Sequence, residues 1–185
     1  VIITCAYGQF LPKEILDYPI HRAIIDGYTT TGITIMYMGQ KMDNGDIISQ
    51  RSIKIEETDN VGTLHDKLSL LGAELLTETL SSIMNGQANR IVQNEEEVTF
   101  GYNISREDEK LDFNQNAKDI YNHIRALSPF PGAYATLDGK IVKIYNAYIK
   151  DEFYTEKENG EIGKAYKDGL GVSCKDLELV ITDVK

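Results

Sequence analysis

The segment that most restricts the fold of this chain is VGTLHDKLSLLGAELLTETLSSIMNG, residues 61–86. Its large apolar side chains recur near the 3.6-residue period of an α-helix, at Val61, Leu64, Leu68, Leu71, Leu75 and Ile83. Asn60 suits the N-cap position, and Gly86 suits the end of a helix. The pattern predicts one long amphipathic helix whose apolar stripe faces a core.

The residues before this helix predict alternating strands and helices. VIITCA, residues 1–6, is a short β-branched run typical of a buried strand. IHRAIIDG, residues 20–27, predicts a short helix that ends at a glycine. TTTGITIMYM, residues 29–38, and DIISQRSIKI, residues 46–55, predict two strands. Residues 1–90 are therefore predicted to form part of an α/β domain.

The residues after the long helix change in character twice. Polar and charged residues dominate the stretch 91–110, which predicts a linker. NAKDIYNHIRAL, residues 116–127, predicts a helix, and Asp138-Gly139 between two strand-like runs predicts a hairpin turn. Two more short strands are predicted around Lys175-Asp176. Short strands after one helix are typical of a small OB-like β-barrel, which is predicted for residues 111–185.

The composition limits the classes of function. The formal net charge of −10 shows no overall basic excess, so a nucleic-acid partner would need a local basic face. No apolar run approaches the roughly 20 residues that span a bilayer, and no basic signal-peptide region is visible. The two cysteines, Cys5 and Cys174, are predicted to be buried thiols, and no zinc-ligand spacing occurs. No metal site is therefore predicted.

The stretch KMDNGDII, residues 41–48, allows two interpretations. Asn44-Gly45 is a favoured pair for a two-residue type I′ hairpin turn, flanked by Asp43 and Asp46 as solvated residues. Alternatively, a carboxylate at a strand end can hold a water or a histidine and move a proton. His21, His65 and His123 lie in no recognisable catalytic motif, and His21 and His65 are interpreted as structural. The residues by themselves leave both interpretations open.

Five motifs of the chain are informative when taken together: AYGQFLP, PIHRAIIDG, TGITIMYM, MDNGDII and IRALSPFPGAYATLDGK. In this order they resemble motifs of the methionyl-tRNA formyltransferase family, which uses 10-formyltetrahydrofolate. The resemblance implies a Rossmann-like formyltransferase domain, here partial, followed by an OB-like β-barrel. It also implies transfer of a formyl group to the α-amino group of methionyl initiator tRNA, without a metal.

The resemblance assigns roles to particular residues. Asp43, the first acid of the Asp-x-Gly-Asp turn, is the implied catalytic residue. The folate pocket is implied at Gln9, Phe10, Leu11 and Met42. The implied tRNA contacts form a local basic face, made by Arg125, Lys140, Lys143 and Lys150. Asp46 is interpreted as a turn or strand-start residue.

The chain also departs from the family pattern. Between Pro19 and Ile20 it lacks a loop that carries the other two implied catalytic groups, an asparagine and a histidine. Sheet strands before Val1 and the last barrel segment after Lys185 are also expected. We expect a cytoplasmic monomer with no membrane partner. The alternatives are a sugar-nucleotide or other amine formyltransferase of the same fold, and a non-catalytic OB-type nucleic-acid-binding protein.

Overall fold

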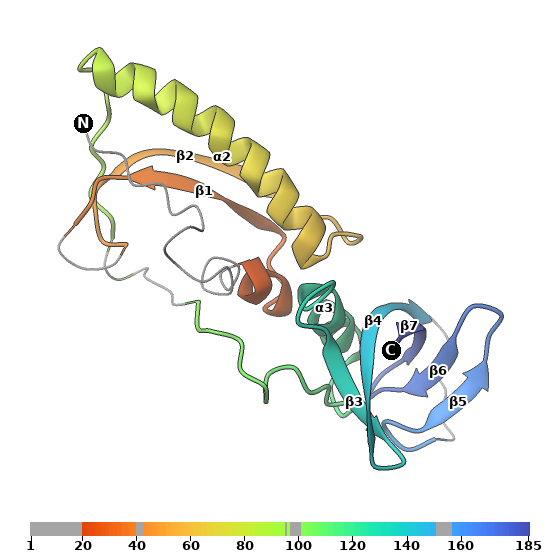
Figure 1. The fold of residues 1–185 in the computed structure, drawn as a ribbon. Helices are drawn as coiled ribbons and strands as arrows, with labels where there is room; N and C mark the ends of the chain where they lie inside the picture. Colours follow the sequence, from red (N-terminus) through yellow and green to blue (C-terminus); the bar gives the residue numbers. More distant parts are fainter. Residues whose placement is uncertain (1–19, 40–42, 95, 97–100, 151–156) are drawn as a thin grey trace.

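The computed structural model of the chain describes residues 20–39, 43–94, 96, 101–150 and 157–185. Its elements form two sheet-containing units, and helix α3 lies between them (Figure 1). The predicted strand at residues 1–6 lies outside the described residues. Both sheets are antiparallel among the strands that the structure describes.

The first unit contains the strand pair β1 (Thr30–Met36) and β2 (Ile47–Lys54). The two strands pair antiparallel with Ile33 opposite Arg51, and their register shifts between Ile35 and Met36. A short helix at residues 20–25 precedes β1, as predicted. The long helix α2 (Val61–Met84) lies along the two strands (Figure 1).

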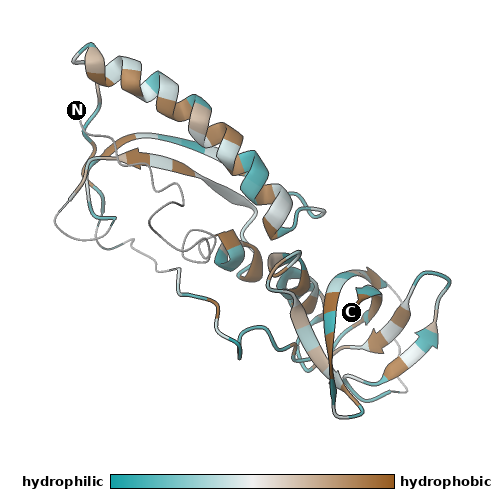
Figure 2. Cartoon of the chain, in the orientation of Figure 1, coloured by the Kyte–Doolittle hydropathy of each residue, from teal (hydrophilic) through white to brown (hydrophobic). Residues whose placement is uncertain are grey.

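Helix α2 follows the sequence prediction closely. Asn60 caps its start, with the amide of Thr63 donating to Asn60 Oδ1 at 2.9 Å and the amide of Asn60 donating to Thr63 Oγ1 at 3.1 Å. Its buried apolar residues are Val61, Leu64, Leu68 and Leu75, and polar and apolar positions alternate along it (Figure 2). Gly86 follows the helix with a φ of 68°, a conformation that glycine adopts without strain.

The second unit begins with α3 (Ala117–Ala126), which packs against a five-stranded sheet. The strands are β3 (Ala133–Leu137), β4 (Lys140–Lys150), β5 (Ile162–Ala165), β6 (Leu170–Ser173) and β7 (Glu178–Val184). Their order in the sheet is β3-β4-β7-β6-β5. The described strands β3 and β5 are the two edges and do not pair, so the closed OB-like barrel stays a prediction.

The predicted turn at Asp138-Gly139 is confirmed. Leu137 pairs with Lys140, and the two turn residues have φ values of 49° and 77°, as a type I′ turn requires. Beneath this hairpin, Ile120, Ile124, Leu127, Ala133 and Ile144 form much of the second unit's core. Cys174 joins that core as a free thiol, and burial raises its pKa to about 12.

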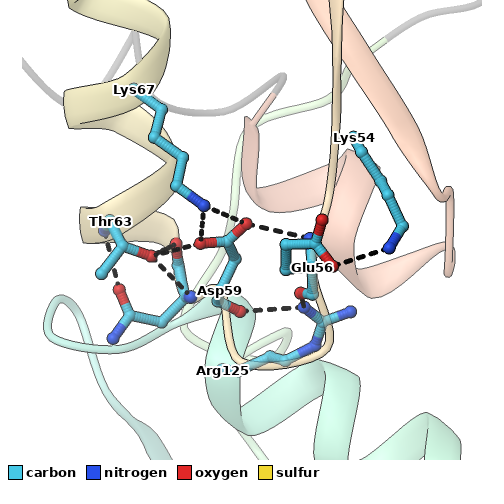
Figure 3. A network of polar contacts seen from close by, with 7 residues as sticks. Lys54, Glu56, Asp59, Thr63, Lys67 and Arg125 are labelled. Carbon is cyan, nitrogen blue, oxygen red and sulfur yellow. Dashed lines mark hydrogen bonds and ion pairs between the residues drawn. The ribbon is translucent and has the colours of Figure 1, made fainter.

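Helix α3 also joins the second unit to the first. Its Ala126 belongs to the first unit's core, beside Ile24, Val61 and Leu64. Arg125 Nη1 donates to the carbonyl oxygens of Asp59 at 2.8 Å and Glu56 at 3.0 Å, in the turn between β2 and α2 (Figure 3). The two units therefore meet through both apolar packing and a buried cation.

The turn that receives Arg125 is itself held by a buried carboxylate. Asp59 is 3% exposed and accepts from Lys67 Nζ at 2.7 and 2.9 Å, from the Glu56 amide and from Thr63 Oγ1 (Figure 3). Burial acts to raise the pKa of the Asp59 carboxyl, but these hydrogen bonds outweigh burial and leave that pKa below its usual value. The turn is thus preorganised to present its carbonyl groups to α3.

Candidate active site

The chain between β1 and β2 places Asp43 on an exposed turn. Asp43 has a φ of 56°, in the left-handed region that aspartate tolerates better than most residues. Neither Asn44 nor Gly45 has a positive φ. A type I′ turn needs positive φ at both central residues, so the interpretation of Asn44-Gly45 as such a turn is wrong.

Close backbone approach, not a positive φ, explains the glycine at position 45. A Cβ atom on Gly45 would lie 1.6 Å from the carbonyl oxygen of Tyr37. The amide of Tyr37 in turn donates to the carbonyl oxygen of Asp46 at 2.9 Å. The turn therefore folds back onto the end of β1 so tightly that only glycine fits.

Residues 91–93, far from this turn in the sequence, form hydrogen bonds with it and with the start of β2. The side-chain amide Nε2 of Gln93 donates to the carbonyl oxygens of Asp43 at 2.8 Å and Gly45 at 2.7 Å. Ile91 exchanges two backbone hydrogen bonds with Ile47, at 2.7 and 3.0 Å. The predicted linker at residues 91–110 thus begins as part of the site, which sequence reasoning missed because no local pattern marks so distant a pairing.

Asp46 and Asp43 differ in what their carboxylates contact. Asp46 Oδ2 accepts from Arg90 Nε at 2.5 Å, and the Arg90 guanidinium lies 4.8 Å from the Tyr37 ring centroid. Asp46 therefore lies just before β2 and pairs with Arg90, which agrees with its interpretation as a turn or strand-start residue. Asp43, whose side chain is exposed, is the acid of the turn that can meet a substrate.

The implied folate-pocket residues and the histidines are the remaining candidates for an active site. Gln9, Phe10, Leu11 and Met42, the implied folate-pocket residues, lie outside the described residues. The three described histidines are placed elsewhere in the fold. His21 is 5% exposed beside the Phe130 carbonyl, His65 lies on the surface of α2, and His123 lies in α3 beside the Asp108 carbonyl. No cluster of three metal-ligating side chains occurs in the part of the chain that the structure describes.

The predicted basic face requires correction at two of its four residues. Arg125 is 8% exposed and its guanidinium binds Glu56, Asp59 and Asn122, so its assignment to an exposed basic face is wrong. Lys143 Nζ is also directed inward, toward Glu109 Oε2 at 2.7 Å and the carbonyl oxygens of Pro131 and Gly132.

The remaining two lysines of that face lie on the surface of β4 or close to it. Lys140 is exposed at the hairpin end of the strand. Lys150 is partly buried, and its Nζ lies 5.2 Å from the Tyr166 ring centroid. Lys140 is thus the exposed member of the predicted face, and Lys150 is partly accessible.

Two family profiles match the chain. One, described as "Formyl transferase", matches residues 17–80, and the other, "Formyl transferase, C-terminal domain", matches residues 103–185. The first contains the Asp43 turn and most of α2, and the second contains α3 and the five-stranded sheet. The chain belongs to the formyltransferase family.

The curated relatives indicate which formyltransferases the chain resembles. Methionyl-tRNA formyltransferases from Staphylococcus aureus strains MW2 and Newman are 46% identical to the chain over 202 residues. The match covers 97% of the chain and 64% of each relative. The 202-residue alignment is longer than the 185-residue chain, so the relatives carry internal residues with no counterpart here. A loop missing between Pro19 and Ile20 would account for them.

Solved structures share the fold at lower identity. An N-formyltransferase from Helicobacter canadensis, in complex with folinic acid and dTDP-3-aminofucose, matches with a TM-score of 0.70 at 19% identity, covering 89% of this chain and 60% of that one. HypX from Aquifex aeolicus in complex with tetrahydrofolic acid matches with a TM-score of 0.69 at 21% identity, covering 89% and 29%. These likenesses establish the fold that carries the Asp43 turn. None of the described helices is long and apolar enough to cross a membrane.

Proposed function

We propose that the protein transfers a formyl group from 10-formyltetrahydrofolate to the α-amino group of methionyl initiator tRNA, acting as a cytoplasmic monomer. The observation that carries the proposal is the 46% identity to methionyl-tRNA formyltransferases over 97% of the chain. The likeness extends through both units, so the part of the relatives implied to hold tRNA has its counterpart here. A sugar-nucleotide amine is the second candidate acceptor, because the Helicobacter canadensis enzyme, which has the same fold, forms a complex with dTDP-3-aminofucose.

In this reaction the amine nitrogen attacks the formyl carbon and forms a tetrahedral oxyanion. The bond from that carbon to folate N10 then breaks, the amine loses a proton, and N10 gains one. Asp43 accepts the amine proton through a water, and its exposed carboxylate is accessible for that role. The resemblance implies an asparagine and a histidine on the loop that the sequence lacks between Pro19 and Ile20. With that loop present, the two side chains would donate to the oxyanion, and such donors are typically worth about 3 kcal/mol each.

The folate donor is proposed to bind beside the turn. Gln9, Phe10, Leu11 and Met42 are the proposed pocket residues, and Met42 directly precedes Asp43 in the sequence. Lys140 and Lys150 are the proposed phosphate contacts, which must act locally against a net charge of −10. Binding through these lysines would weaken as salt increases, and tRNA affinity that is independent of salt would contradict the basic face.

The test begins with the intact mass of the purified polypeptide and a peptide map across Tyr18, Pro19 and Ile20. A mass above 20.8 kDa with extra residues after Pro19 would show that the loop exists. The protein is then incubated with 10-formyltetrahydrofolate and either methionyl initiator tRNA or a dTDP-amino sugar, and the formylated product is measured. Transfer to the tRNA supports the proposal, and transfer to the sugar alone supports the second candidate.

A contiguous Tyr18-Pro19-Ile20 in a 20.8 kDa polypeptide would remove the catalytic part of the proposal, because the oxyanion donors would then be missing. Folate binding still discriminates in that case. A polypeptide that binds 5-formyltetrahydrofolate keeps a formyltransferase site. One that binds only nucleic acid supports the non-catalytic alternative.

A further inference from the structure

The Asp43 turn depends on a contact that neither its sequence nor its hairpin explains. Asp43 has a positive φ, Gly45 closely approaches the Tyr37 carbonyl, and β1 and β2 shift register at Met36. The paired residues of β1 and β2 end at Met36 and Ile47, so the carbonyl groups of Asp43 and Gly45 lie outside the sheet ladder. Both carbonyl oxygens are bound instead by the single side-chain amide of Gln93.

We propose that Gln93 is a positioning residue for the reaction, holding the Asp43 turn in the conformation that presents the catalytic carboxylate. Its two N–H bonds bind two carbonyl oxygens that flank Asn44, at 2.8 and 2.7 Å. Fixing the carbonyl groups on either side of a residue restricts the rotation of the peptide units between them. The inference rests on the proposed function, because it assigns the purpose of this contact to catalysis by Asp43.

The chemistry of the contact is specific to glutamine. An NH₂ group carries two donors, so it can satisfy two carbonyl oxygens at once. Glutamate at position 93 would be acceptor-only when ionised and would repel the same two oxygens. Asparagine has one methylene less and would fall short from the same backbone position.

The backbone of Gln93 is itself tied to the strands that bear the turn. Ile91, two residues earlier, pairs with Ile47 at the first residue of β2. Arg90 forms the ion pair with Asp46. Residues 90–93 therefore lie alongside the start of β2. This pairing fixes the position of the Gln93 backbone relative to the carbonyl groups of the turn.

The expected kinetic signature is a loss in kcat. Gln93 does not contact bound substrate in this scheme, so the KM values for tRNA and folate should change little. A displaced catalytic group costs up to about 100-fold in rate, so Gln93→Ala should reduce kcat about 10- to 100-fold and Gln93→Glu more. Gln50→Ala is the matched control, because the exposed Gln50 Nε2 donates to Thr34 Oγ1 on the hairpin surface.

The second readout is independent of activity. The Tyr37 amide donates to Asp46 across the turn, and the Ile55 amide donates to Thr29 at the other end of the hairpin, each at 2.9 Å. Hydrogen exchange in Gln93→Ala should accelerate at Tyr37 by at least tenfold and stay unchanged at Ile55. Equal acceleration at both amides would indicate general destabilisation and overturn the positioning role.

The experiment measures transfer kinetics and hydrogen exchange for the full chain and the three variants. A kcat loss with unchanged KM values, together with faster exchange at Tyr37, supports the inference. Activity of Gln93→Ala within twofold of the unsubstituted protein overturns it, as does unchanged Tyr37 exchange. If the unsubstituted protein transfers no formyl group, the proposed function fails and the catalytic role of Gln93 fails with it, whereas Tyr37 exchange still decides whether Gln93 holds the turn.

Discussion

Arg125 Nη1 donates to the carbonyl oxygen of Asp59 at 2.8 Å, across the joint between the two units. Both residues are buried, with exposed fractions of 8% and 3%. The carboxylate of Asp59 is meanwhile occupied by Lys67, Thr63 and the Glu56 amide, so the contact uses its backbone (Figure 3). The position of the second unit therefore depends on the shape of the 56–59 turn.

Replacing Arg125 with methionine should destabilise the protein. The variant keeps much of the side-chain volume but leaves the carbonyl oxygens of Glu56 and Asp59 without the Arg125 donor. Charged hydrogen bonds and buried unpaired groups of this kind predict a loss of about 2–4 kcal/mol in the free energy of unfolding. Urea denaturation measures the loss. Lys118→Ala, which removes an exposed ion pair with Glu57 at the same joint, should cost no more than about 1 kcal/mol.

The buried imidazole of His123 predicts a pH dependence of stability. Burial lowers its pKa from 6.5, against the opposing effects of the Asp108 carbonyl and carboxylate. The unfolded chain therefore binds a proton more readily than the folded one, and stability should fall as pH decreases below about 6.5. The slope is at most about 1.4 kcal/mol per pH unit.

His123→Gln supplies the control for that pH dependence. Asp59, Asp108 and Asp112 have lowered pKa values in the folded protein, so the stability that their carboxylates contribute is lost only when the pH falls near or below their usual pKa of 3.8. Between about pH 5 and 7 the difference in unfolding free energy between the two proteins therefore reports His123. Parallel stability curves over that range would contradict the prediction.

Glycine at position 45 should be irreplaceable. An alanine Cβ would collide with the Tyr37 carbonyl oxygen at 1.6 Å, so Gly45→Ala must break the fold of the turn and should cost at least about 2 kcal/mol. Position 139 lies in the confirmed type I′ turn, and an alanine Cβ there would have no atom within 4 Å. Gly139→Ala should therefore lower the free energy of unfolding only through its positive φ, by about 1 kcal/mol. Thermal unfolding of both variants measures the difference, and equal effects would show that steric contact does not decide position 45.

Asparagine at position 43 should remove activity without unfolding the turn. Asn tolerates a φ of 56° as well as Asp does, but its amide cannot accept a proton. Loss of a general base predicts a decrease in kcat of about 100-fold or more in formyl transfer. Asp138→Asn is the matched control, since Asp138 also has a positive φ, of 49°, in an exposed hairpin. Near-normal transfer by the Asp43 variant would exclude its catalytic role.

Two similar dipeptides show what could be read from the sequence. Asp138-Gly139 and Asn44-Gly45 both predict a type I′ turn, and only the first forms one. No atom lies within 4 Å of a Cβ placed on Gly139, so local backbone preference decides that turn. The second is shaped by the Tyr37 carbonyl and by Gln93, whose positions depend on tertiary pairing.

The sequence by itself determined the elements whose signals are local. The apolar period of α2, its Asn60 cap and the helix predicted at residues 116–127 depend on interactions between residues within a few positions of one another. The structure confirms all three. The catalytic assignment of Asp43 came from likeness to a family. Only the tertiary structure decided that Gln93 holds the Asp43 turn and that Arg125 is buried, because both contacts join residues about 50 or more positions apart in the sequence, where spacing carries no signal.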